Sequence, residues 1–159
     1  MQLRRQTDYA LRVLMFLAST PKDQLVNMDQ ISNKFNILQN HLRKIIAKLA
    51  RLKYIVTRRG NGGGIQINSS VLNLTLFEIM RHFESSFESI DCTGLSCPMS
   101  NQCKLQLVLN DASNAYILVL EKYKLKDILP TKNNEQKIIF NRSAFDEVKN
   151  EREHISQPN

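Results

Sequence analysis

Three cysteines are the residues of this sequence whose type and spacing could do chemistry. Cys92, Cys97 and Cys103 are the only cysteines in the 159-residue chain, with four residues between the first pair and five between the second. The stretch between them holds Gly94 and Pro98, so it cannot form a regular helix, and its thiols can converge on one point. An odd number of cysteines argues against a closed set of disulfides. The spacing therefore predicts a zinc site or an iron–sulfur cluster, with one coordination position left for another group.

The sequence shows no sign of membrane insertion or export. No apolar run approaches the ~20 residues that a membrane span requires. The first residues lead into an amphipathic stretch that bears Asp8 and Arg12, whereas a signal peptide needs an uncharged apolar stretch. We therefore expect a cytoplasmic protein, in which thiols stay reduced and clustered cysteines favour a metal over a disulfide.

Positive charge is concentrated in one third of the chain. The formal net charge is +7, and no Asp or Glu occurs between Gln30 and Phe77. That stretch carries eight positive charges, so the rest of the chain sums to −1. A basic face confined to one region is typical of a protein that binds nucleic acid. On charge alone, a solvated basic surface without a partner would be an equal alternative.

Three amphipathic helices are expected in the N-terminal third. Apolar residues at helical spacing predict them over residues 7–19, 28–34 and 39–52. The second and third are joined by a short turn, and the third is basic on its outer face, so together they predict a helix-turn-helix. The third helix is expected to bury Leu42, Ile45, Ile46 and Leu49. The expected N-caps are Thr7 or Asp8 for the first helix and Asn27 for the second.

A β-hairpin is expected directly after the third helix. Residues 54–59 and 65–68 predict two strands around the glycine-rich turn 60–64. A hairpin in this position is a wing, and its glycines allow the backbone to approach DNA closely. The DNA contacts expected from the third helix and the wing are Gln39, Asn40, His41, Arg43, Lys44, Lys48, Arg58, Arg59 and Asn61.

The C-terminal half predicts a segment for cluster binding and dimerisation. A helix is expected over 74–84, where Thr75 and Glu78 have the spacing of a capping box. Another is expected over 104–125, with two apolar faces, one for its own domain and the other for a partner chain. One face holds Leu105, Val108, Ala112, Ala115 and Val119, and the other holds Leu109, Tyr116, Leu120 and Tyr123.

The expected fold class is mainly α with a small β-wing: a winged helix-turn-helix domain plus a long dimerisation helix. Residues 1–74 would form the DNA-binding domain, and residues 75–130 the cluster-binding loop with the dimerisation helices. Residues 131–159 would form a polar, partly disordered tail.

Several motifs carry a resemblance to a known family. They are T-D-Y-A-L-R at 7–12, N-H at 40–41, K-I-I at 44–46, R-G-x-x-G-G at 59–64 and the C-x4-C-x5-C spacing. From Met1 to about Leu129 the chain resembles the Rrf2 family of bacterial regulators, and within it the repressors that sense nitric oxide. The cysteine spacing is the most specific of these motifs.

The resemblance implies a homodimeric repressor, not an enzyme, that binds a palindromic operator in double-stranded DNA. It implies a 4Fe-4S cluster in each subunit, held by Cys92, Cys97 and Cys103, with Asp8 of the partner subunit as fourth ligand. Arg12, one turn beyond Asp8, would hold that carboxylate in place. Nitrosylation or loss of the cluster would release the operator.

Three alternatives have different sequence requirements. Family members that regulate iron–sulfur biogenesis use a 2Fe-2S cluster held by three cysteines and a histidine, but Gln106 stands at the expected histidine position. A zinc-stabilised DNA-binding module without a sensing role would share the wing and the basic region. An enzyme using Cys and His is disfavoured, since His41, His82 and His154 all lie outside the cysteine loop.

Leu38 departs from the family pattern, because related sequences commonly have a small polar cap before the recognition helix.

Overall fold

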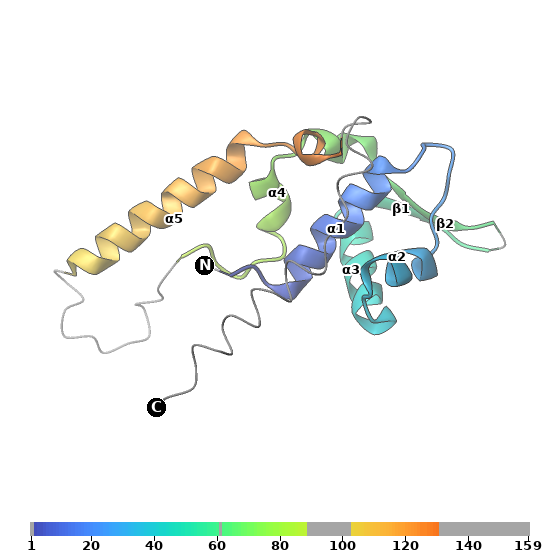
Figure 1. Ribbon diagram of the computed structural model, residues 1–159, viewed down its shortest axis with the longest axis horizontal. Coiled ribbons are helices and arrows are strands. Elements are labelled where there is room, and N and C mark those ends of the chain that lie inside the picture. The colour runs from blue at the N-terminus through green and yellow to red at the C-terminus, as the bar shows by residue number, and fades with distance from the viewer. Residues whose placement is uncertain (1, 61, 89–102, 131–159) are drawn as a thin grey trace, which may run out of the picture. The chain divides into compact units, whose positions relative to one another are not determined.

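The described part of the chain is mainly helical with one small sheet (Figure 1). The computed structural model describes residues 2–60, 62–88 and 103–130. All named elements lie in the first of two units, residues 1–129, so the tail predicted over 131–159 is outside the described residues. The element order agrees with the expected fold class. In chain order the elements are α1 (Arg5–Ser19), α2 (Met28–Phe35), α3 (Gln39–Arg51), β1 (Ile55–Arg58), β2 (Gly64–Ile67), the 3-10 helix η1 (Ser69–Asn73), α4 (Leu76–Met80), α5 (Lys104–Lys122) and the 3-10 helix η2 (Leu125–Ile128).

The core of the described region lies where α1 packs against α3 and β2 and where α2 packs against α3. Leu14 of α1, Ile31 of α2 and Leu42 of α3 are each fully buried. Each such side chain contributes about 1.5–3 kcal/mol relative to an exposed one. The burial predicted for α3 is confirmed, since its buried residues are Leu42, Ile45, Ile46 and Leu49.

The start of α1 differs from the expectation. The helix begins at Arg5 rather than at residue 7, and its N-cap, Arg4, makes no side-chain cap hydrogen bond. Thr7 and Asp8 are therefore not N-caps. Thr7 is fully buried instead, and its hydroxyl donates to the carboxylate of Glu84, 77 residues away in the chain. This distant acceptor, which helical periodicity does not reveal, replaces local capping.

Capping boxes set where α2 and α4 begin: the N-cap predicted at Asn27 is confirmed, with a box to Gln30 that was not predicted, and the predicted box of Thr75 with Glu78 is present. Asn27 Oδ1 accepts from the Gln30 amide at 2.8 Å, and Gln30 Oε1 accepts from the Asn27 amide at 2.9 Å. Thr75 and Glu78 make the same exchange at 3.1 and 2.7 Å. The α4 helix is shorter than the predicted 74–84, because regular helix ends at Met80 and a turn follows.

The wing is an antiparallel hairpin in which Thr57 of β1 is opposite Ile65 of β2. On the outer edge of β2, Val26 exchanges backbone hydrogen bonds with Ile65 at 3.0 and 2.8 Å and so adds an isolated bridge to the hairpin. A side chain at Gly64 would lie 2.8 Å from Leu25 Cβ, so this position needs glycine for close approach. At the tip, Gly62 has φ +77°, which a glycine adopts without strain.

The long helix α5 ends at Lys122 rather than at 125, and the chain returns beside the start of α4. The Tyr123 carbonyl accepts from the Leu76 amide at 2.8 Å, and the Leu125 amide donates to the Leu74 carbonyl at 2.9 Å. Leu125 is fully buried in η2, which fixes the C-terminal end of α5 to the DNA-binding unit. No helix among the described residues is long and apolar enough to cross a membrane.

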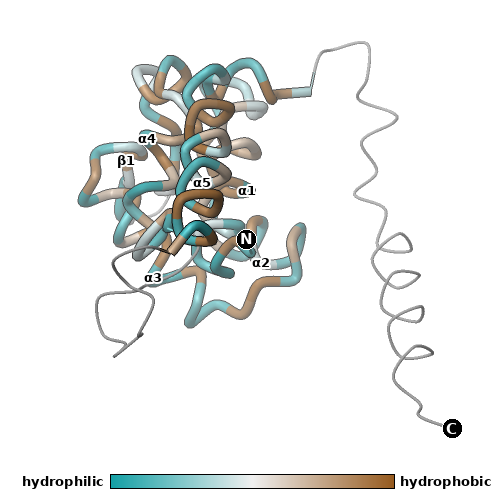
Figure 2. The backbone as a smooth tube through the Cα atoms, turned by 90° about the vertical axis from the view of Figure 1, so that its left-hand side faces the viewer, coloured by the Kyte–Doolittle hydropathy of each residue, from teal (hydrophilic) through white to brown (hydrophobic). Residues whose placement is uncertain are grey.

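Hydrophobic residues recur along α5 in Figure 2, and its two apolar faces differ in burial. Leu109, Tyr116 and Leu120 are half-buried, on the side of α5 that packs against α4. Tyr123, predicted on the same face, follows the end of α5 and is 50% exposed. The other predicted stripe, which holds Leu105, Val108, Ala112, Ala115 and Val119, is exposed within the single chain.

Candidate functional site

The turn between α2 and α3 is held by backbone and side-chain hydrogen bonds. Asn36 adopts the left-handed conformation with φ 50°, which ends α2 and reverses the chain. The Ile37 amide donates to the Ser32 carbonyl at 3.1 Å, and the Ser32 hydroxyl donates to the Ile37 carbonyl at 2.8 Å. The Gln39 side-chain amide also donates to Asp29 of α2 at 2.5 Å. These hydrogen bonds hold α2 and α3 together as a helix-turn-helix. Gln39, a predicted DNA contact, therefore also has a hydrogen-bond partner within the chain.

The outer face of α3 is polar and basic, as predicted. Asn40, His41, Arg43 and Lys44 are all exposed, while the apolar residues between them are buried. A helix of this kind in a helix-turn-helix presents its exposed side chains to the major groove. These four residues form the α3 part of the candidate DNA-binding surface, together with the exposed Gln39.

Lys48 differs from the other predicted contacts on α3. It is half-buried, and its ammonium lies 4.7 Å from the centroid of the Phe83 ring. Phe83 is buried and follows α4 closely, on the way to the cysteines. Lys48 thus joins the recognition helix to the segment that leads into the cysteine loop.

On the wing, Arg58 and Arg59 are exposed, as a phosphate or minor-groove contact requires. Asn61, the remaining predicted contact, lies outside the described residues.

The predicted metal ligands are described only in part. Cys103 is the N-cap of α5, half-buried and not in a disulfide, whereas Cys92 and Cys97 lie outside the described residues. Asp8 is in the first turn of α1, and its carboxylate accepts from Arg12 Nε at 2.7 Å. The predicted Asp8–Arg12 pairing is therefore present, with the two side chains 40% and 31% exposed. Among the described residues, no group of three or more His, Cys, Asp or Glu side chains could hold a metal ion.

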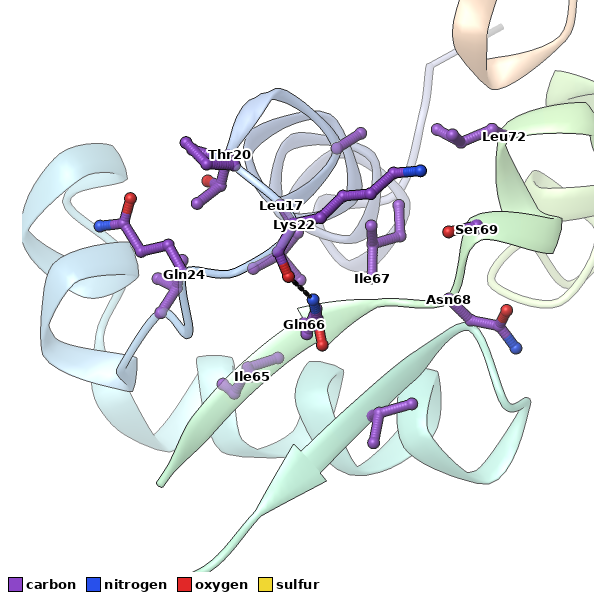
Figure 3. A pocket seen from close by; sticks show the side chains of 14 residues that line it. Leu17, Thr20, Lys22, Gln24, Ile65, Gln66, Ile67, Asn68, Ser69 and Leu72 are labelled. Carbon is purple, nitrogen blue, oxygen red and sulfur yellow. Dashed lines mark hydrogen bonds between the residues drawn. The ribbon is translucent and has the colours of Figure 1, made fainter. Parts of the chain in front are cut away.

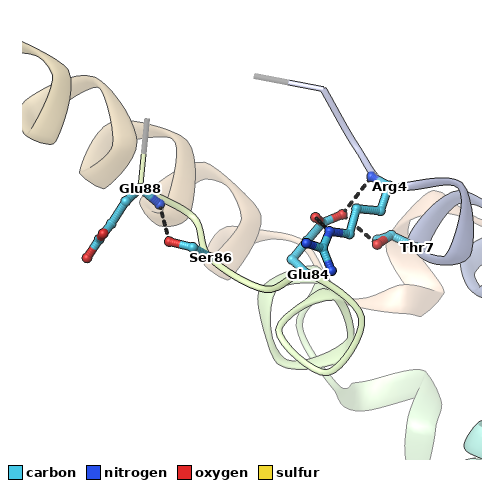
Figure 4. Close-up of polar contacts among 5 residues, drawn as sticks. All are labelled: Arg4, Thr7, Glu84, Ser86 and Glu88. Atoms are coloured by element: carbon cyan, nitrogen blue, oxygen red, sulfur yellow. Dashed lines mark hydrogen bonds and ion pairs between the residues drawn. The ribbon is translucent and has the colours of Figure 1, made fainter. Parts of the chain in front are cut away.

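Glu84 links the end of the α4 segment to the start of α1 (Figure 4). Its carboxylate accepts from the Thr7 hydroxyl and, at 3.0 Å, from the Arg4 amide. Its side chain is only 9% exposed. The chain that continues toward Cys92 is thus fastened to the same end of α1 that carries Asp8.

Aromatic contacts hold the next residues of this segment. The Phe87 ring lies 5.1 Å from the Phe77 ring in α4 and 6.3 Å from the Tyr116 ring in α5. The pKa of the Tyr116 hydroxyl is raised by burial and by the nearby Glu84 carboxylate. At the other end, the His82 ring packs 6.0 Å from Tyr54, which follows α3. Residues 82–87 therefore contact α3, α1, α4 and α5 before the cysteine loop begins.

A separate cavity of about 360 Å³ lies between the end of α1, the loop that follows it and the wing (Figure 3). Its lining is largely aliphatic, and Lys22 is its single charged residue. The Gln66 side-chain amide donates to the Lys22 carbonyl across one side of the cavity. Among the predicted DNA contacts and metal ligands that the structure describes, none lines it.

Comparison with known protein families identifies the family of this chain. The family model described as "Rrf2: Iron-dependent Transcriptional regulator" matches residues 3–131. The chain belongs to the Rrf2 family. It is thus a transcriptional regulator by family, and a regulator of this family implies DNA binding.

Among Rrf2 relatives, the chain is 39% identical over 142 residues to the HTH-type transcriptional regulator NsrR of Bacillus subtilis, covering 87% of this chain and 97% of the relative. The oxidized form of Staphylococcus aureus CymR has a TM-score of 0.67 at 20% identity, covering 82% of this chain and 98% of that one. T. potens IscR has a TM-score of 0.62 at 17% identity, covering 80% and 85%. The sequence similarity supports an NsrR-like member, and the two structures support the winged-helix fold.

Sequence reasoning missed Phe83 and Glu84. Phe83 reads as an ordinary apolar residue of an amphipathic helix and Glu84 as its polar end. Their partners, Lys48 and Thr7, lie 35 and 77 residues away in the chain.

Proposed function

We propose that this Rrf2 regulator is a homodimeric repressor that senses nitric oxide through a 4Fe-4S cluster and releases its operator when the cluster is nitrosylated or lost. The similarity to NsrR over most of both chains carries the proposal, together with the C-x4-C-x5-C spacing. The helix-turn-helix supports the DNA-binding part.

DNA recognition is assigned to the exposed face of α3 and to the wing. In this assignment, Asn40 and Arg43 are suited to base edges in the major groove, and Lys44 is suited to phosphates. Arg58 and Arg59 hold the wing against the backbone or the minor groove. Two such units related by a two-fold axis would read a palindromic operator. Gln39, His41, Lys48 and Asn61 complete the proposed contacts.

The donor set fits the proposed cluster. Cys103 stands half-buried at the start of α5, and thiolates of Cys92 and Cys97 would complete the sulfur ligands. Asp8 of the partner subunit would supply an oxygen, and Arg12 already holds that carboxylate by a 2.7 Å hydrogen bond. When bound, such a cluster supplies an iron with a weak oxygen ligand, open to attack by a small molecule such as nitric oxide.

Contacts within the chain suggest how loss of the cluster would change the position of the recognition helix α3 in each subunit. Release of Asp8 would remove the link between the partner's cluster and the first turn of α1, a turn that Glu84 connects to the segment before the cysteines through Thr7 and Arg4. Movement of the cysteine loop would pull on Phe83, over which Lys48 of α3 lies. The first change acts on α1, which packs against α3, and the second acts on α3 itself. The distance between the two recognition helices of a dimer must match the distance between the two half-sites, so either change would weaken operator binding.

Native mass spectrometry of the protein purified without oxygen tests the proposal. The expected mass is a dimer with one four-iron cluster per subunit, and Cys97→Ser should abolish the cluster. An Asp8→Ala variant should keep the sulfur ligands but hold the cluster less firmly. A two-iron mass would favour the type of cluster used in iron–sulfur biogenesis regulation. Zinc, or no metal, would leave the DNA-binding assignment and remove the sensing mechanism.

A further inference from the structure

Leu38 is the most exposed large apolar side chain in the part of the chain that the structure describes, with 73% of its surface accessible. Most of the others are on α5, which presents an exposed apolar stripe. Leu38 is instead the N-cap of the recognition helix α3, and it makes no side-chain cap hydrogen bond. Its neighbours Gln39 and Asn40 are polar and exposed. This leucine therefore neither caps the helix nor joins the core.

The backbone at Leu38 is held firmly on both sides. Ile37, just before it, is buried and makes two hydrogen bonds with Ser32 of α2. The Leu38 carbonyl accepts from the His41 and Leu42 amides at 3.0 Å each. The side chain is consequently presented to solvent from a fixed position at the first turn of α3. Little ordering of the backbone would be needed when a partner meets it.

The position of Leu38 limits what such a partner can be. In a helix-turn-helix, the N-terminal residues of the recognition helix contact base edges in the major groove. The one apolar group presented there by the bases is the C5-methyl of thymine. We propose that Leu38 is a specificity-determining residue that packs against the methyl group of a thymine in each half-site. This inference rests on the proposed DNA-binding function.

The test begins with a duplex selected from a randomised pool by the full-length protein, purified without oxygen and loaded with its cluster. Each thymine of one half-site is then replaced by deoxyuridine, which lacks only the methyl group. Dissociation constants are measured by fluorescence anisotropy at fixed salt. At one or two positions, loss of a methyl should weaken wild-type binding by about fourfold, the effect of one buried methylene-sized group. For Leu38→Ala, the same replacement should produce no measurable change.

Leu3→Ala is the matched control, since Leu3 is also an exposed leucine, 40% accessible, but precedes α1 outside the helix-turn-helix. It should keep the wild-type sensitivity to the methyl group. Leu38→Met should keep much of it, because methionine is also large and apolar. Equal sensitivity in wild type and Leu38→Ala, or no sensitivity in the wild type, would overturn the inference while leaving DNA binding in place. Failure to enrich any duplex would overturn the proposed function and this inference with it.

Discussion

At the scale of single residues, Glu84 makes a buried hydrogen bond between two distant parts of the chain. Its carboxylate is almost fully covered and accepts from a hydroxyl that is itself fully buried. A buried donor that loses its acceptor bears the full cost of desolvation. Glu84→Ala should therefore lower the free energy of unfolding by about 1–3 kcal/mol, measured by urea denaturation.

Glu88→Ala provides the comparison for this prediction, because Glu88 belongs to the same segment but is exposed. Its effect should stay within about 0.5 kcal/mol. If the two variants lost the same stability, the Glu84–Thr7 hydrogen bond would not be holding α1 to this segment.

His82 offers a test by titration. Burial, followed by the positive charges of Arg81 and Lys48, lowers its pKa below the ordinary 6.5. The native state therefore binds fewer protons at His82 than the unfolded state as the pH falls below about 6.5. The contribution of His82 to the free energy of unfolding is therefore complete above about pH 6.5. It is lost as the pH falls from there through the lowered pKa of the native state.

Lys48→Gln should raise the pKa of His82 toward the ordinary value, since it removes one of the repelling charges. The imidazole resonances of His82, followed by NMR from pH 5 to 8, give the measurement. Arg51→Gln is a suitable control, because Arg51 is another exposed cation of α3 and is not among the causes of the shift. A pKa unchanged by Lys48→Gln would contradict the placement of the Lys48 ammonium beside residues 82 and 83.

At the scale of elements, the wing is expected to bind phosphates without reading sequence. Arg58→Ala and Arg59→Ala should each reduce the slope of log binding constant against log salt concentration by about 1. Neither should alter the thermal midpoint, since both side chains are exposed. Lys122→Ala, an exposed cation at the end of α5, should leave the slope unchanged. An unchanged slope in both arginine variants would mean that the wing does not contact the backbone of DNA.

Local chemistry made some elements predictable from sequence. The N-cap Asn27 and the capping box of Thr75 with Glu78 are local features, so the sequence predicts them, although α4 begins at Leu76 rather than at residue 74. The hairpin followed from alternation around glycines.

Other features depend on contacts between distant segments, which spacing does not contain. Sequence spacing predicts Thr7 as a cap and does not reveal its partner Glu84, which is 77 residues away. Spacing likewise predicts Lys48 as a DNA contact and does not place the Phe83 ring beside it. Two of the three predicted thiolate ligands, Cys92 and Cys97, lie outside the described residues, so the metal site remains a prediction from their spacing.

At the scale of the whole molecule, the exposed stripe of α5 is the expected dimer interface. Val108 lies within that stripe and is 62% exposed in the single chain. Val108→Glu should dissociate the dimer, because a charge buried in an apolar interface without a partner is costly. Analytical ultracentrifugation at micromolar concentration gives the oligomeric state.

Asn110→Glu is the matched control for Val108→Glu, since Asn110 is exposed and, two residues further along the helix, lies on the opposite side of α5 from Val108. This variant should remain dimeric. A Val108→Glu protein that sedimented as a dimer would place the interface elsewhere.

The most direct test of the central proposal is a nitric oxide titration of the cluster-loaded protein on its selected operator, without oxygen. Fluorescence anisotropy would report DNA binding, and the visible absorption of the cluster would report its nitrosylation in the same cuvette. The expected result is that operator release follows the loss of cluster absorption, and that Cys97→Ser protein shows no response to nitric oxide. Operator binding that persisted after complete nitrosylation would contradict the proposal that the cluster gates DNA binding.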